Sequence, residues 1–117
     1  MGKEKEEATQ EITMSQSTDG GRFYQVHGSG TIAQAIRQIH RRALREGRGR
    51  ELAQALHILK RRLQISPENL GEPLYRLAAL RMQIRTAVVG PLAVDFGVCE
   101  DRPVVFIKGV SLLSKST

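Results

Sequence analysis

The feature that most constrains the fold is a change in hydrophobic period along the chain. Apolar residues recur at intervals of three and four between residues 31 and 63, which is the spacing of one face of a helix. From residue 80 onward the interval falls to two or gives way to continuous apolar runs, which is typical of strands. A chain with this order of patterns predicts an α+β fold.

Two amphipathic helices are predicted in the first half of the domain. Thr31 followed by Gln34 fits a capping box that opens the first helix, and Gly47 and Gly49 interrupt the pattern before the second helix, from about Arg50 to Leu63. The apolar stripes of the two helices are Ile32, Ile36, Ile39, Ala43 and Leu52, Leu56, Leu59, Leu63. We expect them to pack as an antiparallel hairpin.

Four strands are predicted around this hairpin, at residues 22–27, 80–88, 92–98 and 104–110. Residues 68–79 contain Gly and Pro and are expected to form a loop or a short helical turn. The order β-α-α-β-β-β predicts a helical hairpin on one face of a mostly antiparallel four-stranded sheet. One domain is expected over 22–113, with disordered polar segments at 1–21 and 114–117.

The positive charge of the chain is concentrated in the helical segment. The net charge is +6 and the isoelectric point is about 10.1. Residues 37–62 hold nine basic and two acidic side chains, which favours either a phosphate-binding surface or a solvated helix face. The basic residues are Arg37, Arg41, Arg42, Arg45, Arg48, Arg50, Lys60, Arg61 and Arg62.

Several classes of protein do not fit this sequence. No apolar stretch is long enough for a membrane-spanning helix, and the N-terminal residues lack the apolar core of a secretory signal, so a cytoplasmic protein is expected. The single Cys99 allows no internal disulfide and no cysteine-based zinc site. Because none of the three histidines is spaced i, i+4 from another, no metal is expected. No glycine loop has the spacing of a nucleotide-binding motif, so no cofactor is expected.

Two local patterns carry a resemblance to a known family. One is LGEPLYRL, from Leu70 to Leu77, between the helices and the next strand; the other is the C-terminal run with a turn at Gly90, the strand LAVDFGV, an acidic turn at Glu100 and the strand VVFIKGV. Over residues 22–113 the chain resembles the RelE/ParE superfamily of toxins from bacterial toxin–antitoxin operons. The resemblance implies either binding to the ribosome and metal-independent cleavage of messenger RNA, or inhibition of DNA gyrase, together with an antitoxin partner.

Carried over to this sequence, the resemblance implies catalytic roles for Arg81 and Arg85, four residues apart and expected on one face of one strand. Arg76 and Lys108 are the further candidates for contact with nucleic acid. The family usually has a tyrosine and an arginine after the glycine turn, where this chain has Pro91 and Leu92. A basic or aromatic pair usually ends the last strand, and this chain lacks it after Lys108.

Three hypotheses follow from these observations. The first is a RelE/ParE-like protein that binds RNA or the ribosome and either retains or has lost endoribonuclease activity. The second is a non-enzymatic module that binds protein or nucleic acid on the same fold. The third is a gyrase-inhibiting toxin.

Overall fold

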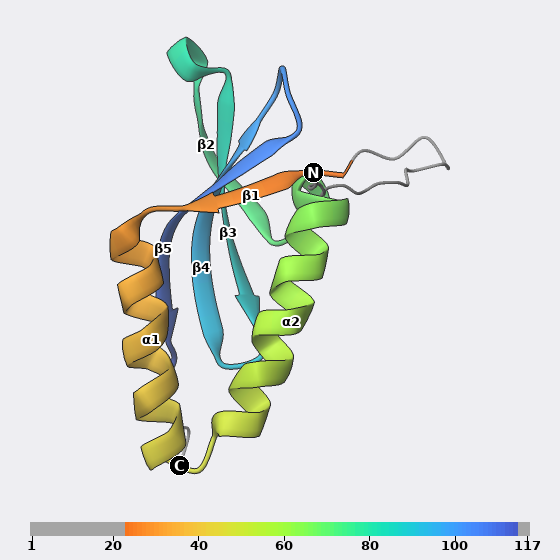
Figure 1. Cartoon of the computed structure of the whole chain (residues 1–117). Coiled ribbons are helices and arrows are strands. Elements are labelled where there is room, and N and C mark those ends of the chain that lie inside the picture. The colour runs from red at the N-terminus through yellow and green to blue at the C-terminus, as the bar shows by residue number, and fades with distance from the viewer. Residues whose placement is uncertain (1–22, 115–117) are drawn as a thin grey trace, which may run out of the picture.

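The computed structural model describes residues 23–114, in which two α-helices cover one face of a five-stranded sheet (Figure 1). The predicted segments 1–21 and 114–117 lie almost entirely outside these residues. The elements, in chain order, are β1 (Gln25–Gly28), α1 (Gly30–Arg45), α2 (Gly49–Ile65), β2 (Glu72–Leu77), β3 (Met82–Val89), β4 (Leu92–Cys99) and β5 (Val104–Leu112), with short 3₁₀ turns at Pro67–Asn69 and Ala78–Leu80. The α+β class is confirmed.

The sheet has the order β1-β5-β4-β3-β2 and is mixed. β1 pairs with β5 in parallel, and the other neighbours are antiparallel. The prediction of four strands was wrong because β2 forms within the segment expected to be a loop. Pro73 is tolerated there because β2 is an edge strand, where a missing N–H costs no bond to an outer neighbour.

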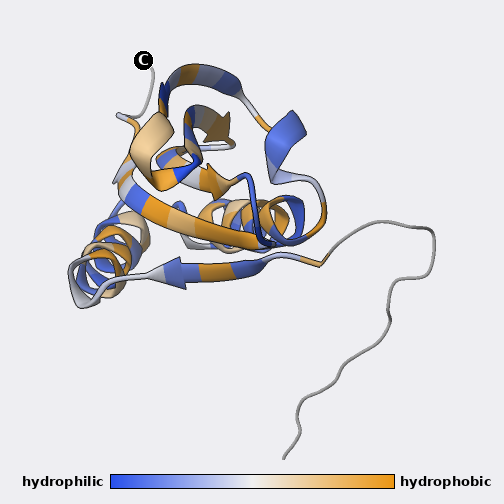
Figure 2. Cartoon of the chain, turned by 90° about the horizontal axis from the view of Figure 1, so that it is seen from above, coloured by the Kyte–Doolittle hydropathy of each residue, from blue (hydrophilic) through white to orange (hydrophobic). Residues whose placement is uncertain are grey.

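The core lies between the helices and alternate residues of β4. Val94, Phe96 and Val98 point toward the helices and are buried, as are Leu52 and Leu63 of α2. Seen from above, both helices lie on the same side of the sheet (Figure 2). Burial of one face of each strand under apolar helix stripes is the main stabilising contribution in a domain of this size.

The helices differ from their predicted boundaries in two ways. Ser29, rather than Thr31, caps α1, and its hydroxyl accepts the Ile32 N–H at 3.3 Å. Gly49 begins α2 rather than interrupting the pattern. The two helices meet at the turn around Gly47 and spread apart toward their other ends (Figure 1), so each packs mainly on the sheet.

The inside and outside of β3 are the reverse of the prediction. The alternation along residues 80–88 predicts a core face made of Leu80, Met82, Ile84, Thr86 and Val88. Instead Arg85, Ala87 and Val89 face the helices and are buried, and Val88 is 64% exposed. The cause is that β3 follows the register of its neighbour β4, in which Val94 and Phe96 form the core face. Pairing with a buried strand outweighs the alternation within β3 itself.

Replacing Gly71 tests the close approach that begins β2. Gly71 has a φ of +66°, and a Cβ atom there would lie 2.0 Å from the carbonyl oxygen of Thr86. We expect Gly71→Ala to lower the free energy of unfolding more than Gly47→Ala, whose φ is +72° but which has nothing within 4 Å. The Gly47→Ala control should cost about 1 kcal/mol, and Gly71→Ala at least about 1 kcal/mol more. Urea unfolding measures both, and equal losses would contradict the structure.

Candidate functional site

The face of the sheet turned away from the helices carries a continuous row of side chains. Strand register places Tyr75 of β2 opposite Ile84 of β3, Ile84 opposite Gly97 of β4, Gly97 opposite Phe106 of β5, and Phe106 opposite His27 of β1. Directly paired residues point to the same face of a sheet. Because Gly97 lies between two core residues of β4, the whole row points away from the helices.

Lys108 joins this row from an irregular position in β5. The register between β4 and β5 shifts at this point, so Lys108 lies in a bulge, and its Nζ lies 6.0 Å from the centre of the Tyr75 ring. Two strands separate β5 from β2, so their backbones are about 14 Å apart at the usual strand spacing. The Lys108 and Tyr75 side chains therefore extend toward each other over β3 and β4.

The floor under this pair is apolar. Ile84 is only 1% exposed although it lies on the face without helices. Gly97 makes this cover possible, because a Cβ atom there would lie 2.4 Å from the sulfur of Met82 and 3.1 Å from Cδ1 of Ile84. Met82 and Ile84 thus lie close over β4, and Tyr75 stands beside them with 51% of its surface exposed.

At the other side of the row, two rings lie together. The imidazole of His27 stacks on Phe106, with ring centres 5.6 Å apart and planes inclined by 30°. His27 is exposed and Phe106 is half-buried. We call His27, Tyr75, Phe106 and Lys108 the open-face cluster. It combines aromatic surface for stacking, an ammonium group for an anion and an imidazole that can carry a proton.

The predicted catalytic pair does not form one surface. Arg81 precedes β3 rather than lying on it, in a left-handed turn with φ of +49° and an exposed side chain. Arg85 lies on the helix-facing side and is 7% exposed, with its guanidinium bonded to Leu70, Gly71 and Gln83. The prediction that both arginines point to one face of a strand was therefore wrong, and their catalytic role stays a prediction.

The predicted nucleic-acid-binding residues fall into two groups. Three are held by carboxylates: Arg42 by Glu46, Arg48 by Glu46 and Glu51, and Arg76 by Glu100. The guanidinium groups of Arg48 and Arg42 hold the pKa of Glu46 below its ordinary value. Apart from Lys108, the others are exposed and have no ion pair within residues 23–114: Arg37, Arg41, Arg45, Arg50, Lys60, Arg61 and Arg62.

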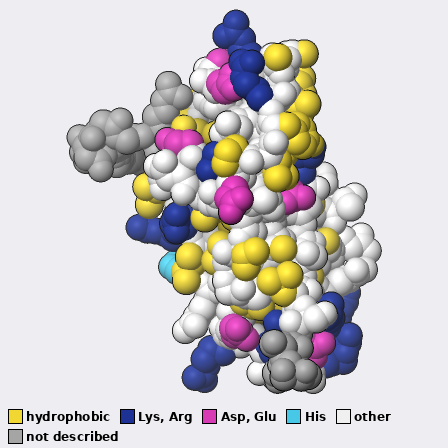
Figure 3. Space-filling model, turned by 180° about the vertical axis from the view of Figure 1, so that it is seen from behind, with side chains coloured by type: hydrophobic (Ala, Val, Ile, Leu, Met, Phe, Trp, Pro, Cys, Tyr) yellow, Lys and Arg dark blue, Asp and Glu magenta, His cyan; other side chains and the backbone are white. Residues whose placement is uncertain are grey.

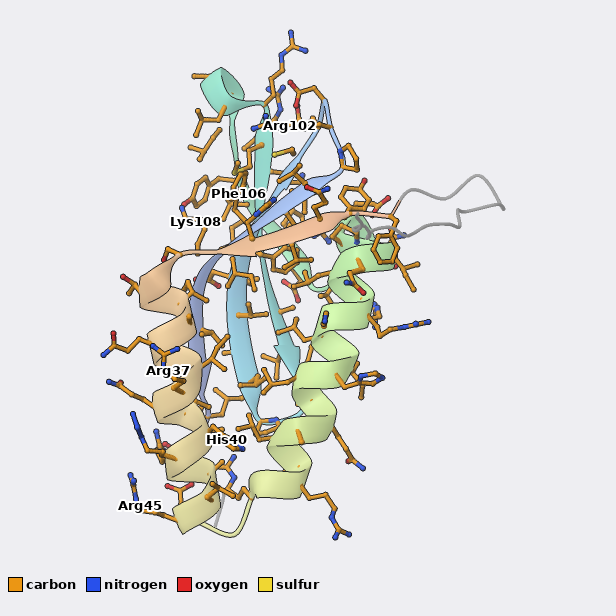
Figure 4. The ribbon with its side chains drawn as sticks, viewed as in Figure 1. Arg37, His40, Arg45, Arg102, Phe106 and Lys108 are labelled. Carbon is orange, nitrogen blue, oxygen red and sulfur yellow. The ribbon has the colours of Figure 1, made fainter. Side chains whose placement is uncertain are left out.

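The exposed arginines of α1 form a stripe apart from the open-face cluster. Arg37, Arg41 and Arg45 follow one another at intervals of four, on the helix side opposite its core residues. Figure 4 shows Arg37 and Arg45 along α1, whereas Phe106 and Lys108 lie on β5 beyond the first turn of that helix. We call these three residues the α1 arginine stripe.

Hydrophobic side chains are also exposed beside the open-face cluster. Leu74 and Leu80 are more than half exposed, close in sequence to Tyr75. Figure 3 shows two groups of hydrophobic side chains on this side of the molecule, with acidic side chains between them. The surface therefore offers apolar as well as charged contacts.

The sequence predicts Lys108 as a contact for nucleic acid and allows Tyr75 to stack on a nucleotide from a loop, but it does not place either beside His27 and Phe106. The members of the open-face cluster come from three strands far apart in the chain, and only strand pairing brings them together. The usable signal was the alternation in residues 72–77, which places Tyr75 and Leu77 on one face once β2 is recognised as a strand. Within the described part of the chain, no group of three His, Cys, Asp or Glu side chains could hold a metal ion.

Comparisons with protein-family models, curated proteins and solved structures found no match to this chain. The resemblance to RelE/ParE toxins therefore stays a prediction. None of the helices in residues 23–114 is long and apolar enough to cross a membrane.

The ion pair between Arg76 and Glu100 predicts a pH dependence of stability. Its bonds measure 2.5 and 2.7 Å, and the guanidinium of Arg76 lowers the pKa of Glu100. The pair therefore stabilises the fold above the ordinary pKa of a glutamate, and this contribution is lost as the pH falls through the lowered pKa. We expect the melting temperature of the parent to fall more steeply in acid than that of Glu100→Gln.

The control for this experiment is Glu68→Gln, which makes the same change at an exposed carboxylate outside the ion pairs of residues 23–114. The plot of its melting temperature against pH should stay parallel to that of the parent. Parallel plots for the parent and Glu100→Gln would show that the Arg76–Glu100 pair does not contribute to stability.

Proposed function

We propose that this chain is a RelE/ParE-like protein that binds single-stranded RNA, including exposed RNA of the ribosome, on the open face of its sheet. The observation that carries the proposal is the 6.0 Å approach of the Lys108 ammonium to the Tyr75 ring, above an apolar floor. The cation comes from β5 and the exposed aromatic ring from β2, and the two meet on the open face above β3 and β4.

The chemistry of the open-face cluster favours RNA over a small anion. Unpaired bases stack on exposed aromatic side chains of sheets, and basic side chains next to those rings contact the phosphates. Tyr75 and Phe106 supply two rings on strands at separate places in the sheet. A small anion would need only the ammonium group, and the aromatic surface would add nothing to its binding.

The α1 arginine stripe supports a partner larger than a single nucleotide. Arg37, Arg41 and Arg45 have no ion pair among the described residues, so their charges remain free for phosphates. Along an α-helix they are spaced at about 6 Å intervals, so the stripe extends over about 12 Å. A folded or long RNA, such as ribosomal RNA, could contact the stripe and the open-face cluster together.

The open-face cluster also holds groups that RNA transesterification uses. In such a reaction the 2′-oxygen loses its proton and attacks the phosphorus, and the 5′-oxygen leaves and takes up a proton. The imidazole of His27 is able to accept or donate the proton, and the ammonium of Lys108 to stabilise the charge on the phosphate oxygens. This assignment replaces Arg85, whose guanidinium is occupied by backbone carbonyl groups.

Binding is tested with a fluorescein-labelled single-stranded RNA, by fluorescence anisotropy at several salt concentrations. We expect Tyr75→Ala to weaken binding about tenfold, the loss expected for one stacking ring. Lys108→Ala should weaken binding. It should also reduce the slope of the logarithm of the binding constant against the logarithm of the salt concentration by about one, the value for one phosphate contact. The control is Arg102→Ala, which also removes one positive charge, from an exposed position outside the predicted binding residues.

A loss with Arg102→Ala as large as that with Lys108→Ala would contradict the proposal, because binding would then follow net charge alone. Full affinity in Tyr75→Ala would exclude stacking at this site. In either case the protein-binding module of the second hypothesis would become the better account, with the exposed Leu74 and Leu80 as its contact surface.

Cleavage is tested with the same RNA in the presence of a chelator. Metal-independent transesterification leaves a 2′,3′-cyclic phosphate, which mass spectrometry detects, and His27→Ala should abolish it. In cells, induced expression followed by pulse labelling should reduce protein synthesis. A fall in DNA synthesis alone would instead support the gyrase-inhibiting hypothesis.

A further inference from the structure

β2 carries Tyr75 of the open-face cluster, but burial of its side chains hardly holds it in place. The residues from Glu72 to Arg76 are all exposed, and only Leu77 is half-buried. The burial of apolar side chains, which fixes β4 and β5, therefore contributes little here. β2 is therefore positioned by its backbone bonds to β3, by the Arg76–Glu100 ion pair near its end and by the contacts at its beginning.

Arg85 makes the contacts at the beginning of β2. Its Nε donates to the carbonyl oxygen of Leu70 at 3.0 Å, and its Nη2 donates to that of Gly71 at 3.1 Å. Its third bond runs from Nη1 to Oε1 of Gln83 at 2.9 Å. The planar guanidinium thus fixes two consecutive carbonyl groups directly before the strand.

These bonds hold the chain before β2 in a fixed position relative to β3, and so act as a clamp on the register of the two strands. Arg85 pairs with Pro73 across the two strands, and Pro73 supplies no N–H to the ladder at that position. An extra residue, Leu74, follows before the pairing resumes at Tyr75 and Ile84. In a strand, a shift by one residue moves every side chain to the opposite face. A clamp beside a bulge therefore determines which face Tyr75 occupies.

We propose that Arg85 is a positioning residue, which holds the register of β2 and thereby keeps Tyr75 on the open face beneath Lys108. Arg85 itself lies on the helix-facing side of β3, so it touches no RNA bound to the open-face cluster. The effect on Tyr75 is independent of the ligand, whereas the effect on RNA binding rests on the function proposed above.

The position of Tyr75 is measured without RNA. The chain has two tyrosines and no tryptophan, so Tyr24→Phe leaves Tyr75 as the single fluorophore. In that parent we expect Arg85→Met to raise the acrylamide quenching constant of Tyr75, because the ring leaves its place beside Ile84 and Lys108. The control Arg41→Met, at an exposed site on α1, should leave quenching unchanged.

Arg85→Lys provides the second variant, because Arg85→Met leaves two carbonyl groups unpaired and could prevent folding. A lysine keeps the charge but lacks the planar fork that binds both carbonyls and Gln83 together. Its quenching constant should therefore lie above that of the parent. A value equal to the parent in Arg85→Lys, or in a folded Arg85→Met, would overturn the proposal.

RNA binding then separates positioning from direct contact through a double-mutant cycle. We expect a folded Arg85 variant to lose up to about tenfold in affinity in the presence of Tyr75 and to lose nothing further in a Tyr75→Ala background. Independent, multiplicative losses would mean that Arg85 contacts RNA itself and would overturn the proposal. If the parent binds no RNA, the proposed function fails, and the quenching result still decides the role of Arg85.

Discussion

The burial of one face of β4 beneath the two helices is the constraint on which the rest of the structure depends. Val94, Phe96 and Val98 are almost completely buried there, and each pairs with β3 on one side and β5 on the other. The register of both neighbouring strands follows from this strand. Once the helices cover that face, every residue between the core positions must point to the opposite side, and this makes Gly97 the centre of the open face.

The open face has a core of its own although no helix covers it. Ile84 and Cys99 are buried by neighbouring side chains, including Met82 close over Gly97. Tyr75 and Lys108, the exposed groups around them, come from β2 and β5, which lie on either side of β3 and β4. The cluster therefore depends on the tertiary structure more than on any local motif. A shift of the edge strand β2 would separate Tyr75 from Lys108 while leaving the helix-covered core intact.

The sequence predicted those parts of the fold that rest on local periodicity. The stripes of Leu52 to Leu63 and of residues 92–98 correspond to a helix and a strand whose burial follows the pattern. The prediction from the sequence failed for the two faces of β3, because pairing with β4 turned Arg85 inward. It also failed for β2, whose place depends on that same arginine. Lys108 was predicted as a nucleic-acid contact, but its grouping with His27 and Tyr75 was not, because only strand order brings the three together.

The proposed binding of RNA to the open face is tested most directly by an NMR titration of the ¹⁵N-labelled protein with single-stranded RNA. We expect the largest amide shifts at Tyr75, Ile84, Gly97, Phe106 and Lys108, with smaller shifts along the α1 arginine stripe. Shifts confined to α1 and α2, with the row across the sheet unchanged, would contradict it.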